Sequence, residues 1–399
     1  MKTPLLKKTL PQEVRRALSK RSELLDDRVQ TCVVVPDATR PLPFEAALRP
    51  LFEELARRNI PTTVIVGLGL HRPMTDGELA PLREAIGALP IDLVQHDARA
   101  NLTDLGNAEN LPASAPKNLS ISLNHHVVRA KRIICVGTVE PHQYAGFSGG
   151  IKAISIGCAG KDTISAMHGI SLLRDPKSTL GLVDKNPFQQ TLWRIAAPIR
   201  DRQILGLQFV PAPGGGIFAL FFDEIRPAFD RACETAAGQF FEECPHQLDW
   251  LHLPVPDVKA TNFYQASRAA TYASLVDRSA LRPGGTIVLE ASCPEKIGQG
   301  AGEKACALAM SRGREVLLEE LRARREVQTT GGQQRAYVLA RACERNQIAL
   351  VGAPPIAELA AFGIAQFDTF KEARSSLHLE EKRGRRIGDL FHRIPVISS

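Results

Sequence analysis

The first 210 residues alternate short runs of β-branched residues with segments of helical periodicity. Runs typical of strands cover residues 31–35, 63–66, 91–94 and 132–136, and apolar residues recur at helical spacing across residues 44–59. This alternation is typical of strands joined by crossover helices, which place neighbouring strands parallel to each other. The sequence therefore predicts an α/β fold whose N-terminal domain has a largely parallel sheet.

A second α/β unit is expected after a segment that is rich in turn-forming residues. Residues 208–257 contain several prolines and three consecutive glycines, which interrupt regular structure. Beyond them the alternation resumes, with expected elements at residues 281–285 (turn), 286–290 (strand), 336–346 (helix) and 347–351 (strand). We therefore expect two α/β domains, residues 1–250 and residues 257–399, with the active site in the cleft between them.

The composition fits an ordinary globular protein and argues against membrane insertion or secretion. The chain has 399 residues, of which 44% are hydrophobic and 23% charged, enough for two domains with their own cores. No run of 18 apolar residues occurs, and the N-terminal segment lacks the apolar centre of a secretory signal. A cytoplasmic protein that does not bind membranes is the expectation.

Charge and cysteine content exclude two further classes. The net charge of +7 is spread along the chain, and the densest basic stretches contain acids and lack interleaved aromatic residues. Nucleic-acid binding is therefore not expected. The eight cysteines are scattered without a C-x-x-C pair, which favours free buried thiols over a zinc–thiolate site.

The densest potential chemistry lies in residues 137–168, GTVEPHQYAGFSGGIKAISIGCAGKDTISAMH. A glycine-rich turn separates His142 from Lys152, and His168 follows 16 residues later. Glycines let backbone N–H groups approach an anion closely. Around that turn, imidazole and amine groups suggest proton transfer, covalent or phosphate attachment, and metal ligation. Each of these residues alone is more often structural or solvated, so only the set points to function.

Other polar residues follow the predicted strands directly. Asp37 follows the first strand, His71 the second, and His142 the fourth. In open α/β sheets, ligands bind beyond the carboxyl ends of the strands. The sequence therefore predicts one shared site. From the residues alone, Asp37 and Arg40 fit a helix N-cap as well as an anion-binding turn.

Histidines outside these motifs are weaker candidates. His125 and His126 form a second possible metal pair, but on a strand their side chains would point to opposite faces, so a joint site is not expected. His96 also follows a strand end.

Four ordered motifs resemble the nickel-dependent lactate racemase family, whose members use a nickel pincer nucleotide, the nickel complex of pyridinium-3,5-bisthiocarboxylic acid mononucleotide. The PH-x-x-AGFSGG-x-K pattern with a downstream histidine falls on residues 141–168. The other three motifs are Asp37-Ala38-Thr39-Arg40-Pro41, Gly69-Leu70-His71-Arg72 and Tyr264-Gln265-Ala266-Ser267-Arg268.

The resemblance implies a role for each matched residue. It implies that His71 and His142 are the acid/base pair, that Lys152 holds the cofactor through a thioamide, and that His168 ligates nickel. Asp37, Ala38, Thr39 and Arg40 would hold the nucleotide, with Arg40 also facing the substrate or a phosphate. Tyr264, Gln265 and Arg268 would bind the substrate, Gln265 and Arg268 through its carboxylate.

One departure from the family bears on the substrate. The family usually has lysine at the position of Arg268. Arginine reaches further and binds two oxygens at once, so the exchange is not neutral. It favours a larger or more acidic 2-hydroxy acid than lactate, such as malate.

The function that the resemblance implies is a racemase or epimerase of a 2-hydroxy acid. Hydride would leave C2 for the cofactor and return to either face, while the two histidines exchange the hydroxyl proton. Its expected partners are a small 2-hydroxy acid and the enzymes that build the cofactor. Two alternatives remain open: a zinc hydrolase built on His71, His142 and His168, and a non-catalytic nickel-nucleotide binding protein. No G-x-G-x-x-G follows the first strand, so a nicotinamide dehydrogenase is disfavoured.

Overall fold

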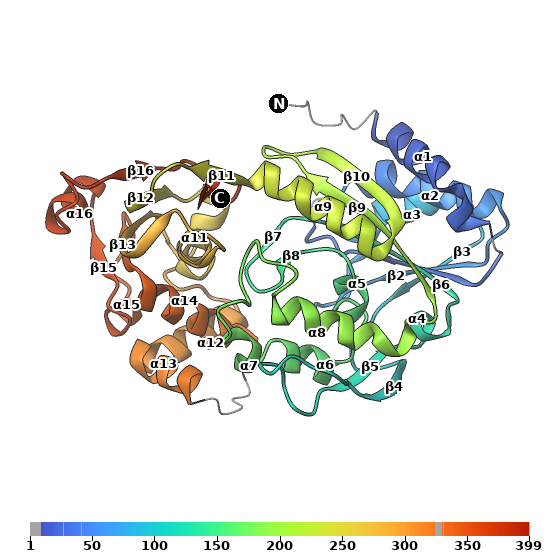
Figure 1. Ribbon diagram of the computed structural model, residues 1–399, viewed down its shortest axis with the longest axis horizontal. Coiled ribbons are helices and arrows are strands. Elements are labelled where there is room, and N and C mark those ends of the chain that lie inside the picture. Colours follow the sequence, from blue (N-terminus) through green and yellow to red (C-terminus); the bar gives the residue numbers. More distant parts are fainter. Residues whose placement is uncertain (1–8, 27, 41, 324–328, 330, 399) are drawn as a thin grey trace.

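The computed structural model describes residues 9–26, 28–40, 42–323, 329 and 331–398, and it contains two parallel-rich sheets covered by helices (Figure 1). The first sheet has the strand order β10-β9-β6-β1-β2-β3, and only β10 is antiparallel to its neighbour. The mixed α/β architecture that the sequence predicts is confirmed. The strands of the first sheet are β1 (Thr31–Val35), β2 (Thr62–Val66), β3 (Ile91–Gln95), β6 (Arg132–Thr138), β9 (Gln203–Pro211) and β10 (Ile217–Glu224).

Helices cover both faces of this sheet, which explains its β-branched central strands. Val33 and Val35 of β1 pack into one core, and Cys32 and Val34 pack into the core on the opposite face. Strands buried on both faces are apolar at every position. The first core includes residues of α1 (Leu10–Lys20), α2 (Phe44–Arg57) and α3 (Asp76–Ile86). The second includes residues of α4 (His125–Arg129), α5 (Lys152–Ser155), α6 (Lys161–Met167), α7 (Ile170–Leu173) and α8 (Pro187–Ala196).

Smaller elements complete the N-terminal part. They are η1 (Ser22–Leu25), the antiparallel pair β4 (Leu102–Asn107) and β5 (Ser120–Asn124), the short hairpin β7 (Pro141–His142) and β8 (Gly146–Phe147), η2 (Ala197–Ile199), and α9 (Ile225–Phe240), which packs on β9 and β10.

The strand order creates a binding crevice. The chain runs outward from β1 to β2 and β3, then returns to place β6 on the other side of β1. The connections after β1 and β6 therefore leave in opposite directions. A crevice forms at the carboxyl ends of strands where the order reverses in this way.

The second sheet has the order β15-β14-β13-β12-β16, and all its neighbours are parallel. Its strands are β12 (Leu248–Pro254), β13 (Leu281–Glu290), β14 (Gln347–Val351), β15 (Ala365–Phe367) and β16 (Gly384–Arg386). Its helices are α10 (Asp257–Ala260), α11 (Phe263–Leu275), α12 (Ala301–Ser311), α13 (Arg314–Arg322), α14 (Gln333–Arg345), α15 (Glu358–Ala361) and α16 (Phe370–Ser376).

Two sequence expectations for this region are changed or left open. The turn expected at residues 281–285 is wrong, because these residues form the start of β13. The pairing register with β12 shifts there, which accommodates the proline and the two glycines within the strand. The division into residues 1–250 and 257–399 stays a prediction. β12, which spans residue 250, is hydrogen-bonded in the second sheet.

The contacts that join the N-terminal and C-terminal parts include a strand pair and a helix pair. β11 (Phe241–Cys244) pairs in parallel with β17 (Ile394–Ile397), so the end of the chain lies beside the crossover between the sheets. Helix α14 packs against α7, and Arg341 donates to the carbonyl oxygen of Leu173. These contacts fix α14 against the N-terminal part.

The cysteines and helices bear on two further expectations. All eight cysteines are buried free thiols, as the sequence predicts. In the part of the chain that the structure describes, no helix combines the length and apolarity needed to cross a bilayer.

A buried glutamine ties the sheet to the glycine-rich turn. Gln208 of β9 has no exposed surface, and its side-chain oxygen accepts from the backbone N–H of Gly150 at 2.8 Å. Its amide nitrogen donates to the carbonyl oxygen of Cys135 on β6 at 2.7 Å. Gln208 therefore fixes the turn relative to the strands from which the site is built.

Replacing this glutamine tests the link. Gln208→Met keeps the side-chain length but leaves the N–H of Gly150 and the carbonyl of Cys135 unpaired. We expect the free energy of unfolding in urea to fall by about 2 kcal/mol or more, because each buried unpaired group costs about 1–3 kcal/mol. Gln190→Met, at an exposed position on α8, should change it by less than about 0.5 kcal/mol. Equal losses in the two variants would contradict this role.

Candidate active site in the cleft

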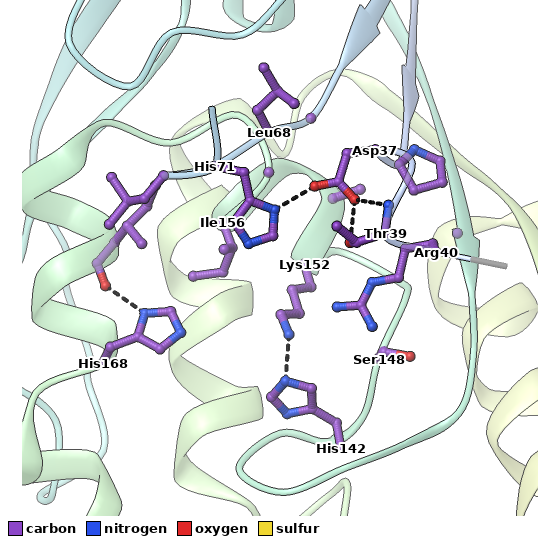
Figure 2. A pocket seen from close by; sticks show the side chains of 18 of the residues that line it. Asp37, Thr39, Arg40, Leu68, His71, His142, Ser148, Lys152, Ile156 and His168 are labelled. Atoms are coloured by element: carbon purple, nitrogen blue, oxygen red, sulfur yellow. Dashed lines mark hydrogen bonds and ion pairs between the residues drawn. The ribbon is translucent and has the colours of Figure 1, made fainter. Parts of the chain in front are cut away.

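A cavity of about 480 Å³ opens at the carboxyl ends of β1, β2 and β6 and extends to α11 and α14. Figure 2 shows its N-terminal side, where side chains from distant stretches of chain face one another. The sequence-predicted residues that line it are Asp37, Thr39, Arg40, His71, His142, Lys152, His168, Tyr264 and Arg268. The chain therefore brings nine of the predicted side chains to one cavity.

Two predicted residues do not line the cavity. Ala38 is exposed on the turn after β1, and its neighbours Asp37 and Thr39 face inward. On α11 the cavity face consists of Tyr264 and Arg268, which are four residues apart, and Gln265 lies off that face. Pro41, the last residue of the first motif, lies outside the described residues.

Asp37 holds His71 in place. The Asp37 carboxylate is buried and lies 2.5 Å from Nδ1 of His71, and its other oxygen accepts from the backbone N–H of Thr39 at 3.1 Å and from its hydroxyl at 2.5 Å. Burial alone would raise the pKa of Asp37, but the hydrogen bonds from His71 and Thr39 outweigh it and lower the pKa. With the Nδ1 proton of His71 donated to this carboxylate, Nε2 is free to exchange a proton.

The helix N-cap alternative for residues 37–40 is wrong. Helix α2 begins at Phe44, after Pro43, and Asp37 instead closes a local turn onto Thr39. Arg40 continues from that turn and forms an ion pair with Glu140, with 3.1 Å between Nη1 and Oε1.

The glycine-rich turn admits no larger residues at two positions. Gly149 and Gly150 have φ of 81° and 58°, in the left-handed region. A Cβ on Gly149 would lie 2.7 Å from Val139, and one on Gly150 would lie 2.6 Å from Phe229. This close packing places Lys152, at the start of α5, against the cavity.

His142 and Lys152 form a hydrogen-bonded pair. Nζ of Lys152 lies 2.8 Å from Nε2 of His142 (Figure 2). Nδ1 of the same ring accepts from the backbone N–H groups of Tyr144 and Ala145 at 3.3 and 3.2 Å. Because Nδ1 accepts, the proton of a neutral ring is on Nε2. Nε2–H can then donate only to a lysine that has an open lone pair, that is, to a neutral amine.

Burial and charge favour these neutral forms. Burial, and then the positive charge of Arg40, lower the pKa of Lys152 to about 7. Burial, and then the charges of Lys152 and Arg40, lower the pKa of His142 well below its usual value. Lys152 is therefore a nucleophilic amine near neutral pH.

His168 presents a single nitrogen to the cavity. Its Nδ1 donates to the carbonyl oxygen of Ile164 at 2.9 Å, which leaves the lone pair of Nε2 available. Burial lowers the pKa of His168, so the ring is neutral. A neutral imidazole whose other nitrogen donates to a carbonyl is the usual form of a metal-ligating histidine.

The helix that precedes His168 starts without a capping side chain. Helix α6 begins at Lys161 after Gly160. The hydroxyl of Thr163 donates to the carbonyl oxygen of Ser120 at 2.8 Å, so it is engaged with β5. His168 is the residue that ends the helix.

The remaining histidines considered do not line the cavity. Both ring nitrogens of buried His96 have hydrogen-bond partners. Nε2 lies 2.9 Å from the carbonyl oxygen of Ala159, and Nδ1 lies 3.2 Å from the side-chain amide nitrogen of Asn124. His125 and His126 begin α4, which Asn124 caps, so their assignment to a strand is wrong. Their ring centroids lie 3.9 Å apart.

Sequence reasoning missed residues that the C-terminal part and the hairpin supply. Gln334 and Arg335 of α14 line the cavity, as does Tyr144. The only sequence signal for the helix residues is the Gly331-Gly332 turn that precedes them.

The state of Lys152 can be tested on the chain without cofactor. Because its pKa is lowered to about 7, the nucleophilic free amine is present above that pH and is lost as the pH falls through it. We expect acetylation of Lys152 by acetic anhydride, followed by peptide mass spectrometry, to reach its half-maximum near pH 7. Exposed Lys177 is the internal reference. A half-maximum for Lys152 near pH 10 would contradict a neutral amine.

Comparisons with known proteins agree with the motifs. Residues 5–181 match the lactate racemase N-terminal domain. A lactate racemase from Thermoanaerobacterium thermosaccharolyticum is 24% identical over 357 residues, which cover 85% of this chain and 78% of the relative. A lactate racemase from Lactiplantibacillus plantarum is 25% identical over 177 residues, which cover 43% of this chain and 40% of the relative.

Two solved structures share the fold. The lactate racemase apoprotein from T. thermosaccharolyticum superposes with a TM-score of 0.80 at 22% identity, covering 97% of this chain and 92% of that one. A protein from Thermotoga maritima superposes with a TM-score of 0.68 at 17% identity, covering 99% of both chains. This chain is therefore similar to lactate racemases, through the domain match over residues 5–181 and through sequence similarity over most of its length.

Proposed function

We propose that this protein is an isomerase that racemises or epimerises a 2-hydroxy acid. The observation that carries the proposal is the placement of His71 and His142 on one cavity, with His71 held by the Asp37 carboxylate and His142 held by backbone N–H groups of the hairpin. Racemisation requires proton exchange on opposite sides of one carbon, and two separate imidazoles supply it. The lactate racemases among its relatives support the same class of reaction.

The cavity residues fit the nickel pincer nucleotide that the motifs imply. Lys152 offers a neutral amine for a covalent link, and Nε2 of His168 offers one neutral metal ligand. Among the described residues, no three His, Cys, Asp or Glu side chains are grouped to hold a metal ion. His168 would therefore share the nickel with donors of the organic ligand. When bound, the nucleotide supplies a reversible acceptor for the C2 hydride.

The two histidines lie in different surroundings. Nδ1 of His71 is bound to the Asp37 carboxylate, which leaves Nε2 for proton exchange. Burial lowers the pKa of His142, and the positive charges of Arg40 and Arg268 add to this effect, so the ring is neutral. Each turnover uses both imidazoles, one on each side of the reacting carbon.

The two alternatives gain no comparable support. For a zinc hydrolase, the three imidazoles would have to converge on one ion, but His142 points at Lys152 and His71 is bound to Asp37. A pure carrier would need Lys152 and His168 but has no use for a carboxylate that orients His71.

Cofactor attachment has a readout that does not depend on activity. In protein produced together with the cofactor-building enzymes, Lys152→Ala should lose the covalent mass increase seen in intact-mass spectra, because no amine remains to be acylated. His168→Ala should keep the mass increase and lose nickel in elemental analysis. Lys161→Ala, an exposed lysine at the start of α6, is the matched control and should load fully. Full loading of Lys152→Ala would contradict covalent attachment there.

The acid/base assignment predicts a symmetrical defect. In the loaded enzyme, His71→Ala and His142→Ala should each lower kcat by about 10²–10⁴-fold in both directions, since each turnover uses both imidazoles. Chiral chromatography of each enantiomer's product measures this. His125→Ala removes a histidine outside the cavity and should leave kcat unchanged. If either cavity variant keeps full activity in both directions, the two-histidine scheme fails.

A further inference from the structure

The C-terminal side of the cavity holds two arginines that lack anionic partners. Arg268 of α11 and Arg335 of α14 both line the cavity, and the residue Arg335 is only 2% exposed. Within the described residues, Nε and Nη1 of Arg335 and Nε of Arg268 are buried without any hydrogen-bond partner. Neither guanidinium forms an ion pair with a carboxylate of any residue that the structure describes.

Two buried guanidinium groups without anionic partners are energetically unfavourable unless a bound anion accepts their hydrogen bonds. Buried guanidinium groups in proteins are normally paired, because desolvated charge is costly when its donors are left unused. Cζ of Arg335 lies 5.2 Å from the ring centroid of Tyr264, which supports one face of the guanidinium but satisfies none of its N–H groups. Burial, and then the neighbouring charge of Arg335, lower the pKa of Arg268. The two cations therefore lie close enough to repel each other.

The helix that carries Arg335 is fixed in position and adds positive potential. Gly332 precedes the 13-residue helix α14 with φ of 101°, and a Cβ there would lie 1.9 Å from the carbonyl oxygen of Gly302. Only glycine permits this approach of α14 to α12. The N-terminal end of a helix carries a partial positive charge, and Gln334 of the first turn lines the cavity with Arg335.

Charges on the opposite side of the cavity already have partners. Arg40 pairs with Glu140, Lys152 is bound to His142, and Asp37 is bound to His71 and Thr39. The demand for negative charge is therefore concentrated at Arg268 and Arg335. A ligand with one carboxylate would neutralise only one of the two cations.

We propose that Arg268 and Arg335 bind the two carboxylates of one substrate, so that the substrates are 2-hydroxydicarboxylic acids of about the size of malate. This inference rests on the proposed racemase function. Arg268 lines the same cavity as His71 and His142 and stands at the carboxylate-binding position of the Tyr264–Arg268 motif, so we assign to it the carboxylate beside the reacting carbon. Arg335 takes the carboxylate of the side chain and is the residue that sets specificity. A monocarboxylic acid such as lactate leaves Arg335 unpaired.

Binding to the chain without cofactor tests the proposal directly. Isothermal titration calorimetry is carried out with (R)-malate, (S)-malate, (S)-lactate and inorganic phosphate. Malate represents the dicarboxylic acids, lactate the monocarboxylic acids, and phosphate the anionic group of a nucleotide. We expect malate to bind at least about 10-fold more tightly than lactate. Arg335→Met should weaken malate binding by about 10- to 100-fold, the range for a hydrogen bond to a charged group, and change lactate binding less than about 3-fold.

Two further variants serve as controls for this titration. Arg345→Met removes a positive charge from the exposed end of the same helix and should leave malate binding unchanged. Arg335→Lys keeps the charge but loses the two-pronged geometry, so it should recover part of the malate affinity. If Arg335→Met does not fold, the Arg335→Lys titration still decides, because an intermediate malate affinity with unchanged lactate affinity is the expected result.

Several outcomes would overturn the inference. Equal affinities for malate and lactate, or malate binding that ignores Arg335, would remove the basis for a dicarboxylate. Phosphate binding that depends on Arg335 without malate binding would assign the pair to a nucleotide phosphate instead. If malate binds through Arg335 but the loaded protein interconverts no 2-hydroxy acid, the two-arginine site stands and the racemase function falls.

Discussion

The hydrogen bond between Nε2 of His142 and Nζ of Lys152 is the contact on which the chemistry of this protein depends. The backbone N–H groups of the hairpin donate to Nδ1 of the ring, so Nε2–H of the neutral ring donates its hydrogen bond to the lysine. Burial of both groups lowers both pKa values and makes the neutral pair the stable one. A lysine that would be an inert cation on the surface becomes a nucleophile in the cavity.

The fold supplies this contact by local packing around one crevice. The strand order reverses between β1 and β6, and Asp37, Thr138 and His142 follow at or beyond these strands. Gln208 then ties the glycine-rich turn to β6 and sets the position of Lys152. The C-terminal part closes the cavity with α11 and α14, which carry its unpaired positive charge. In the proposed function, one side performs proton chemistry and the other recognises anions.

The sequence predicts the parts of this architecture that are encoded locally. β1, β2, β3 and β6 are each found within two residues of their predicted bounds. Of these, β1, β2 and β6 are buried at every position, as expected for strands covered on both faces. Residues that follow such strands, such as Asp37 and His71, could be assigned to one site for the same reason. β4 and β5 were not predicted, since half-exposed polar strands carry no such pattern.

Residues whose position depends on distant packing could not be predicted. Arg335 reaches the cavity because Gly332 packs against Gly302 and α14 docks on α7, and the Gly331-Gly332 turn by itself indicates neither partner. The same holds for Gln208, which is one polar residue in an apolar strand until β6 and the turn are placed beside it. The tautomer of His142 likewise follows from backbone geometry alone.

The most direct test of the central claim is nitrogen-15 NMR of the imidazole rings, with His142 assigned from a His142→Gln variant. We expect a neutral ring that carries its proton on Nε2 and stays neutral as the pH falls below 6.5, the ordinary pKa of histidine. A His142 that is an imidazolium at neutral pH, or that carries its proton on Nδ1, would contradict the neutral pair and with it the nucleophilic Lys152.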